Sequence, residues 1–175
     1  MLLRLASALM LALGVGQADL LHVYGDLPPP AVKPDQVLYY PVSADAARVF
    51  SNALAQSATN KTLAVIVFGA DWCHDSRSLA KVLTSEDFRS QFGGRYEVTF
   101  IDVGRPQTGE GRNLDLVRRL GVKDLKSTPA LFVLRPDGKV LNGKKDAVSW
   151  RNAESRGADK VLGWFRGFDR KHTSD

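Results

Sequence analysis

The sequence predicts an α/β protein built as a three-layer sandwich, in which helices flank a mixed central sheet. Residues 63–68 (LAVIVF) form a continuous, branched, apolar run, which is typical of a strand buried on both faces. Segments with a helical spacing of apolar residues stand before and after this run, as parallel crossover connections require. The chain of 175 residues is 44% hydrophobic and 25% charged, an ordinary composition for a globular domain.

Two segments precede the expected domain. Residues 1–18 combine Arg4, an apolar run and a small-x-small end, a pattern typical of a cleaved secretory signal peptide. The alternative is an uncleaved anchor, but the apolar run is short for a membrane-spanning helix. Residues 19–42 include LPPPAVKP, whose prolines exclude a regular helix. We therefore expect a signal peptide at 1–18, an extended proline-rich arm at 19–42, a domain at 43–171 and a tail at 172–175.

The first half of the domain is expected to alternate helices and strands. Ser43 is placed to cap a helix that runs to residue 58, and the apolar strand follows. A helix is then predicted over 73–83, and Ser85 is placed to cap a second helical piece. Residues 96–103 (YEVTFIDV) have the composition of another strand.

The second half of the domain is expected to close the sheet with a hairpin. A polar loop over 104–112 leads to a short helix that Asn113 caps and Gly121 ends. Residues 130–135 and 139–141 flank Pro136-Asp137-Gly138, which is a hairpin signal. Because hairpin strands pair antiparallel, the sheet is expected to be mixed, and a final helix over 158–171 completes the sandwich.

Charge and cysteine content exclude several classes of function. The formal net charge is +5, but the basic residues are interleaved with acids and form no block with aromatic residues. We therefore expect no nucleic-acid partner. The single cysteine excludes an internal disulfide and a zinc site of several thiolates, and we expect no metal and no cofactor. The signal peptide predicts a periplasmic or secreted protein with no stable membrane insertion after cleavage.

The residues that carry chemistry fall in two places. Trp72-Cys73-His74-Asp75-Ser76 follows the first strand, and Thr128-Pro129 precedes the hairpin. A cysteine at the start of a helix meets unpaired N–H donors and the positive end of the dipole, which favour a thiolate. His74 and Arg77 would add positive charge, and the Ser76 hydroxyl is placed to donate to the sulfur. A metal site or a Cys-His-Asp hydrolase is disfavoured, because adjacent residues at a helix start point in different directions.

Three sequence segments, FGADWCHDS, STPAL and RPDGKVL, resemble the thioredoxin superfamily, with a likeness that runs from Ser43 to Phe168. The likeness is strongest to secreted bacterial thioredoxin-like proteins with W-C-x-D followed by Cys or Ser. It implies a thioredoxin-like fold, a cis Pro129, and a groove in which Trp72 and Thr128 contact a bound peptide. The chain departs from dithiol thioredoxins at Ser76, which replaces the second cysteine, and at Val67, which replaces a buried acid.

The leading hypothesis is a secreted thiol protein of thioredoxin fold with a monothiol C-x-x-S motif. Cys73, with Ser76 and His74, would carry out disulfide exchange, isomerisation or deglutathionylation of exported proteins, with glutathione as a further partner. A thiolate without a second cysteine cannot release itself from a mixed disulfide, so an external thiol must complete the reaction. The alternative is a non-catalytic module that binds peptides or proteins in the groove of Trp72, Thr128 and Pro129, with an inert Cys73. The sequence leaves open whether the protein is an enzyme, in which case it would be a disulfide oxidoreductase or isomerase.

Overall fold

The computed structural model describes residues 37–172, and the predicted signal peptide, most of the predicted arm and residues 173–175 lie outside this range. Its sheet has three strands in the order β2-β1-β5. Strand β1 (Leu63–Gly69) lies in the centre, parallel to β2 (Tyr96–Asp102) and antiparallel to β5 (Ala130–Leu134). The predicted mixed sheet is therefore confirmed, and β1 is buried along nearly its whole length.

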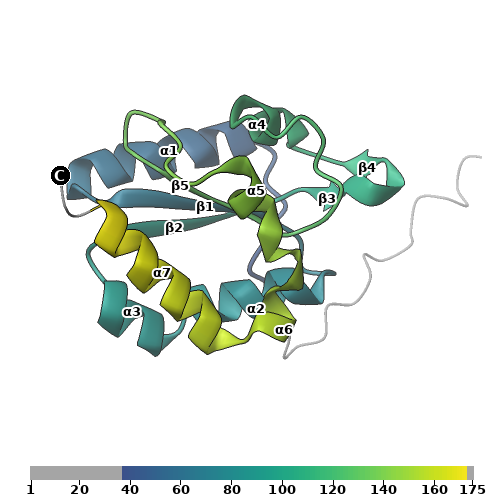
Figure 1. Ribbon diagram of the computed structural model, residues 1–175. Helices are drawn as coiled ribbons and strands as arrows, with labels where there is room; N and C mark the ends of the chain where they lie inside the picture. Colours follow the sequence, from purple (N-terminus) through teal and green to yellow (C-terminus); the bar gives the residue numbers. More distant parts are fainter. Residues whose placement is uncertain (1–36, 173–175) are drawn as a thin grey trace, which may run out of the picture. The chain divides into compact units, whose positions relative to one another are not determined.

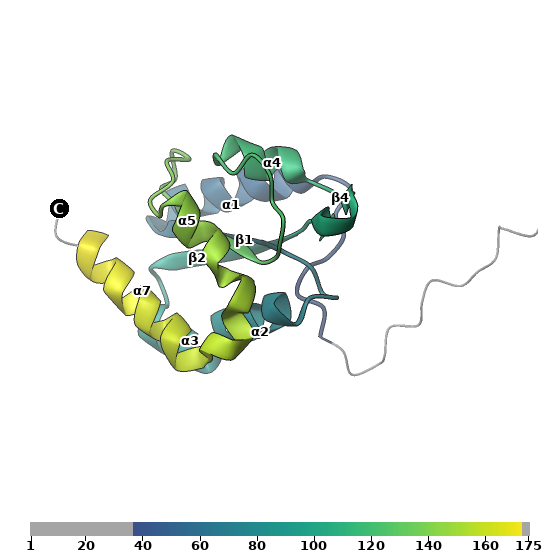
Figure 2. The same cartoon turned by 45° about the vertical axis from the view of Figure 1, so that its right-hand side comes forward.

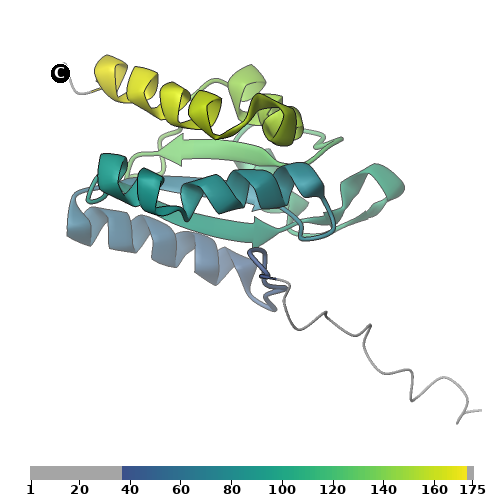
Figure 3. The ribbon, with the colours of Figure 1, turned by 90° about the horizontal axis from the view of Figure 1, so that it is seen from below.

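Helices cover both faces of this sheet, so the predicted three-layer sandwich is confirmed (Figure 1). One face packs against α1 (Ala46–Asn60) and α4 (Leu114–Arg119). The other packs against α2 (His74–Leu83), α3 (Glu86–Phe92) and α7 (Ala158–His172). Figure 2 separates the two helical layers, and Figure 3 shows the teal α2 and α3 in front of the strands with the yellow α7 beside them.

Alternation along β1 explains how one strand serves two cores. Val65 and Val67 point to the layer of α2, α3 and α7, whereas Ile66 and Phe68 point to the layer of α1 and α4. The first core holds an aromatic cluster in which Phe165 of α7 contacts Phe88, Phe92 and Tyr96 at centroid distances of 5.0, 5.7 and 5.1 Å. These contacts fix α3 and α7 against the sheet.

Several local expectations differ from the structure. Asp45, not Ser43, caps α1, since its carboxylate accepts the Arg48 N–H at 2.8 Å while the Ser43 hydroxyl accepts the Asp45 N–H. Asn113 precedes α4 as expected but makes no capping hydrogen bond, because its side-chain amide donates to the Asp102 carbonyl at 2.8 Å. Ser85 caps α3 as predicted, accepting the Phe88 N–H.

The connections contain more structure than the sequence indicates. The expected loop over 104–112 is a small hairpin of β3 (Gly104–Arg105) and β4 (Glu110–Gly111), joined by the 3-10 turn Pro106–Thr108. The expected second strand of the closing hairpin is reduced to one bridge between Leu134 and Val140. Before α7 stand three unpredicted short helices, α5 (Lys144–Ala147), a 3-10 segment (Val148–Asn152) and α6 (Ala153–Arg156).

The end of the expected arm also packs on the domain. Tyr40 is 2% exposed and belongs to the same core as α2, and its ring meets Phe100 edge to face at 5.3 Å. Its hydroxyl donates to the Ser76 carbonyl at 3.0 Å. The backbone N–H groups of Tyr39 and Tyr40 donate to the Asp71 carboxylate at 2.9 and 3.1 Å. Residues 39–40 therefore join the domain to the turn that precedes α2.

We expect Tyr40 and Tyr96 to ionise only when the protein unfolds at alkaline pH. Burial is the largest cause that raises the pKa of both phenols, followed by the Asp71 charge at Tyr40 and by the hydrogen bond to Asp169 at Tyr96. A raised pKa in the folded state means that the fold favours the neutral phenol. The two phenols therefore contribute fully to the free energy of unfolding below pH ~10, and this contribution is lost as the pH rises through their folded-state pKa values. Tyrosinate absorbance and circular dichroism should therefore change together for these two residues. Their ionisation in a still-folded protein would contradict this prediction.

Candidate active site

The candidate site lies where the central strand ends and α2 begins. Cys73 is the residue that precedes α2, and its backbone N–H donates to the Ala70 carbonyl at 3.0 Å. Its carbonyl accepts the Arg77 N–H, the first bond of the helix. The turn therefore places the thiol at the amino end of a ten-residue helix, as the sequence predicts.

The structure brings Cys73 together with the loop that precedes β5, although more than fifty residues separate them. The Cys73 thiol donates to the Thr128 carbonyl at a sulfur–oxygen distance of 3.5 Å. The Thr128–Pro129 peptide bond is cis. Cys73 is 9% exposed and Thr128 4%, so the thiol lies at the edge of the surface with one side against this loop.

Two buried hydroxyl groups near this thiol have no hydrogen-bond partner within the described residues. They are those of Ser76 and Thr128, and both oxygen atoms are inaccessible to solvent. The predicted hydrogen bond from Ser76 to the Cys73 sulfur is therefore absent, and Ser76 is instead held through its carbonyl, which accepts from Tyr40. Unsatisfied buried hydroxyls are rare in folded proteins, which makes these two groups unusual.

The expected positive charges near the thiol are engaged elsewhere. His74 is largely exposed, and its Nε2 lies 3.8 Å from a carboxylate oxygen of Asp75 and 3.7 Å from one of Glu154. Asp75 also accepts the backbone N–H of Glu154 at 2.9 Å, which joins α2 to α6. Arg77 donates to the Asp71 carbonyl at 2.6 Å. Arg77 and Asp75 therefore hold the turn and helix in place around Cys73.

Trp72 stands at the surface beside the thiol in a fixed orientation. Its side chain is 39% exposed, and the indole N–H donates to the Gly104 carbonyl at 2.9 Å. The Arg105 guanidinium lies 4.9 Å from the centre of the ring. The β3–β4 hairpin thus supports Trp72, a role that the expected loop over 104–112 did not suggest.

Two roles at this site were missed by sequence reasoning. Asp71 binds the N–H groups of residues 39 and 40 and so joins the amino-terminal segment to the turn, and Tyr40 contacts the first turn of α2. The only signal in the sequence is an acid two residues before the cysteine, and this does not indicate its partner. Among residues 37–172, no group of three His, Cys, Asp or Glu side chains is arranged to hold a metal ion.

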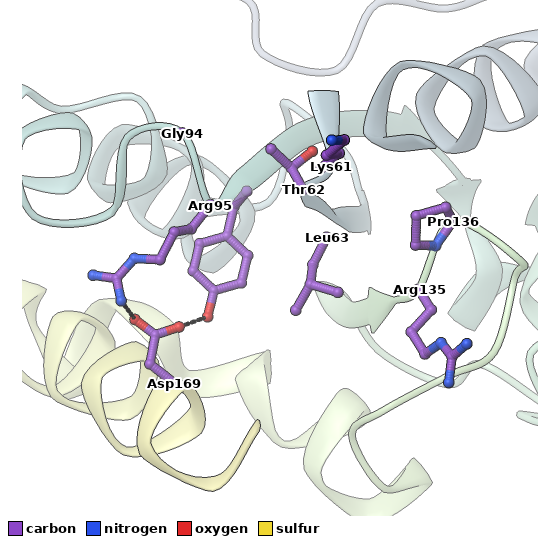
Figure 4. A pocket seen from close by; sticks show the side chains of 9 residues that line it. Lys61, Thr62, Leu63, Gly94, Arg95, Arg135, Pro136 and Asp169 are labelled. Carbon is purple, nitrogen blue, oxygen red and sulfur yellow. Dashed lines mark hydrogen bonds and ion pairs between the residues drawn. The ribbon is translucent and has the colours of Figure 1, made fainter. Parts of the chain in front are cut away.

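A hollow of about 420 Å³ lies at the opposite end of the sheet from Cys73 (Figure 4). It is lined by the first residues of β1 and β2 and by Asp169 of α7. Two of its charged groups pair with each other, since the Asp169 carboxylate lies 2.7 Å from Arg95, and this carboxylate also accepts from Tyr96. No thiol lines it, because the single cysteine of the chain is Cys73.

Comparison with known proteins finds a likeness to a solved structure. The chain matches no family model and no curated protein. It is similar to a solved structure described as a disulphide isomerase from Xylella fastidiosa Temecula1, with a TM-score of 0.65 and 31% sequence identity. The match covers 75% of this chain and 96% of that one. Within the described residues, the helices are all too short or too polar to span a membrane.

Proposed function

Because this chain belongs to the thioredoxin superfamily, we propose that it exchanges thiols and disulfides through Cys73 alone, with exported proteins as its clients. The observation that carries the proposal is the position of Cys73, at the amino end of α2 and against the Thr128 carbonyl. The likeness to a disulphide isomerase supports the same chemistry. Trp72, Thr128 and Pro129 are the proposed client contacts. The predicted signal peptide supports a periplasmic or secreted location.

The proposed reaction has two steps. The Cys73 thiolate attacks one sulfur of a client disulfide, the client S–S bond breaks, and the other client sulfur leaves as a thiolate. This step forms a mixed disulfide between Cys73 and the client. The chain has no second cysteine, so a further client thiol or glutathione must attack the mixed disulfide and restore Cys73. Attack by a client thiol forms a new disulfide within the client and so rearranges its disulfides. Attack by glutathione on the client sulfur leaves the client joined to glutathione by a disulfide.

The unpartnered hydroxyls supply a role for the C-x-x-S motif. When Cys73 is a thiolate it needs hydrogen-bond donors, and Ser76 and Thr128 each hold a hydroxyl with no partner nearby. Ser76 stands three residues after Cys73, so the two side chains share one side of the first helical turn. We propose that Ser76 stabilises the thiolate in this way and that His74, at the exposed start of α2, contacts the client.

The test is capture of the mixed disulfide. The protein is incubated with scrambled, disulfide-bonded ribonuclease, quenched in acid and analysed by intact mass. We expect a Cys73–client adduct and slow recovery of ribonuclease activity, and we expect Cys73→Ser to show neither. Ser78→Ala, a change on the same helix, is the matched control and should behave as the wild type. Absence of an adduct with the wild-type protein would refute the proposed exchange reaction.

The second candidate is a peptide-binding module with an inert thiol, and the burial of Cys73 favours it. The thiol is 9% exposed and its sulfur is occupied by the Thr128 carbonyl. An alkylating reagent separates the two functions. If the protein is a redox protein, Cys73 should react much faster at neutral pH in the folded protein than in the denatured one. If it is an inert binding module, Cys73 should react only after denaturation.

A further inference from the structure

The exposed apolar side chains of the described domain are concentrated beside Cys73. Across residues 37–172, the large hydrophobic residues classed as exposed are Val37, Leu38, Val42 and Trp72. Leu38, Val42 and Trp72 line the same hollow, of about 540 Å³. Apolar side chains that share one hollow in this way, unlike those scattered singly, form a candidate interaction surface.

This hollow, here named the side hollow, is a built feature with two fixed walls. It is lined by residues of the segment 38–42, by Asp71 and Trp72 of the turn before Cys73, and by residues of β2, of the β3–β4 hairpin and just after it. One wall is the segment 38–42, which the Asp71 carboxylate holds through the N–H groups of Tyr39 and Tyr40. The other is the β3–β4 hairpin, which projects beyond the end of the sheet (Figure 1). Its volume is that of a small-molecule or side-chain pocket.

The charges of the side hollow favour an apolar occupant over an acidic one. At its floor the buried Asp102 carboxylate pairs with Arg112 at 3.0 Å and accepts the Gly104 N–H at 3.1 Å. Burial, as the largest cause, raises the pKa of Asp102, and the Arg112 charge opposes this shift. Three carboxylates and two guanidiniums line the hollow, which disfavours a further negative charge.

The side hollow begins at the turn that carries Cys73, and Thr128 is not among the residues that line it. Asp71 and Trp72, the two residues before Cys73, form its near end, whereas the sulfur contacts Thr128. An extended chain advances ~3.3 Å per residue and presents alternate side chains to one face. A side chain two residues from a client cysteine therefore lies ~7 Å from it on the same face, and the side hollow begins at Trp72, the residue next to Cys73.

We infer that the side hollow receives a large apolar side chain of the client, two residues from the client cysteine, so that the protein selects extended segments with that pattern. This inference rests on the proposed exchange reaction at Cys73. It adds a subsite formed by the amino-terminal segment and the β3–β4 hairpin, apart from the Thr128 loop.

The probes are two short peptides, each with one cysteine joined by a disulfide to thionitrobenzoate. They differ only in the residues two positions before and after the cysteine, which are Leu in one peptide and Asn in the other. The Cys73 thiolate attacks the peptide sulfur, the peptide–thionitrobenzoate bond breaks, and coloured thionitrobenzoate leaves as Cys73 becomes bonded to the peptide. Each rate is divided by the rate of the same peptide with free cysteine, which removes differences in intrinsic reactivity.

We expect the Leu peptide to react roughly tenfold faster than the Asn peptide, as burial of one leucine side chain would produce. In the double variant Leu38→Ser, Val42→Ser this ratio should fall close to one. Both residues are more than half exposed, so the substitutions leave the core intact, and circular dichroism checks this. Val37→Ser is the matched control, because Val37 is equally exposed but does not line the hollow, and it should keep the preference.

Equal rates for the two peptides with the wild-type protein would overturn the side-hollow inference, as would a preference that survives in the double variant. Reaction of wild-type Cys73 with free dithionitrobenzoate separates the two levels of failure. If this small disulfide reacts but the peptides show no preference, the subsite fails and the exchange reaction stands. If Cys73 reacts with neither the small disulfide nor the peptides, the proposed function fails and the inference fails with it.

Discussion

Ser76→Cys is expected to turn a protein that cannot reduce insulin by a dithiol reaction into one that can. Residues three apart at a helix start have their Cβ atoms about 5–6 Å apart, and small backbone adjustments bring such a pair into disulfide range. The new cysteine would resolve the mixed disulfide at Cys73, a step that the single thiol of the natural chain cannot perform.

The local structure allows this substitution at low cost. The Ser76 hydroxyl has no hydrogen-bond partner, so its loss leaves no donor or acceptor unsatisfied. Gly69 faces it across the core, and a Cβ there would lie 2.8 Å from the Ser76 oxygen. The absence of a side chain at Gly69 therefore lets Ser76 and the Tyr40 ring pack closely against this backbone, and the cysteine that replaces Ser76 has to turn its sulfur away from Gly69.

The measurement is insulin reduction in the presence of dithiothreitol, together with a count of free thiols after mild oxidation. Ser78→Cys is the matched control, since a residue five positions after Cys73 points to another side of the helix and should not form a disulfide with it. Two free thiols in oxidised Ser76→Cys would show that the first turn of α2 does not hold residues 73 and 76 as the structure has them.

The sequence predicts the elements whose signal is local. The apolar run of β1 and the Ser85 cap of α3 can be predicted from neighbouring residues alone. The Cys73 turn follows from the resemblance to a known family. The thiol's contact with the Thr128 carbonyl follows from it only in outline, because the resemblance places the loop but not the hydrogen bond.

The elements that sequence reasoning missed depend on tertiary contacts. The short helices between 144 and 156 have too few residues for a helical period, and they form around Trp150, which is fully buried and meets Trp164 at 5.3 Å. Asn113 has the residue type of a cap but donates to the Asp102 carbonyl instead. The hydrogen bonds of Asp71 to residues 39 and 40 join segments about thirty residues apart, and no local pattern encodes them.

Tyr40→Ala is expected to be the most damaging single substitution in the amino-terminal segment, lowering the free energy of unfolding by about 3–5 kcal/mol. Tyr40 is 2% exposed, packs on Phe100 and fills the space that Gly69 leaves open, where a Cβ would lie 2.6 Å from its ring. Tyr40→Phe keeps the ring and loses only the hydrogen bond to the Ser76 carbonyl, so it should cost about 1 kcal/mol. Leu38→Ala, two residues away and 53% exposed, should change stability by less than about 0.5 kcal/mol.

Tyr40→Ala should also loosen the candidate site, because it removes the hydroxyl that donates to the Ser76 carbonyl in the first turn of α2 and the ring that packs in the same core, although the backbone N–H that binds Asp71 remains. Alkylation of Cys73 well below the melting temperature should therefore accelerate in Tyr40→Ala. Phe165→Ala, a fully buried aromatic position in α7, should cause a comparable loss of stability without this acceleration. Equal alkylation rates in the two variants would show that Tyr40 stabilises the fold without positioning the thiol.

Urea unfolding of a chain that begins at residue 43 provides an independent check, since removal of Tyr40 by truncation should destabilise the domain at least as much as Tyr40→Ala.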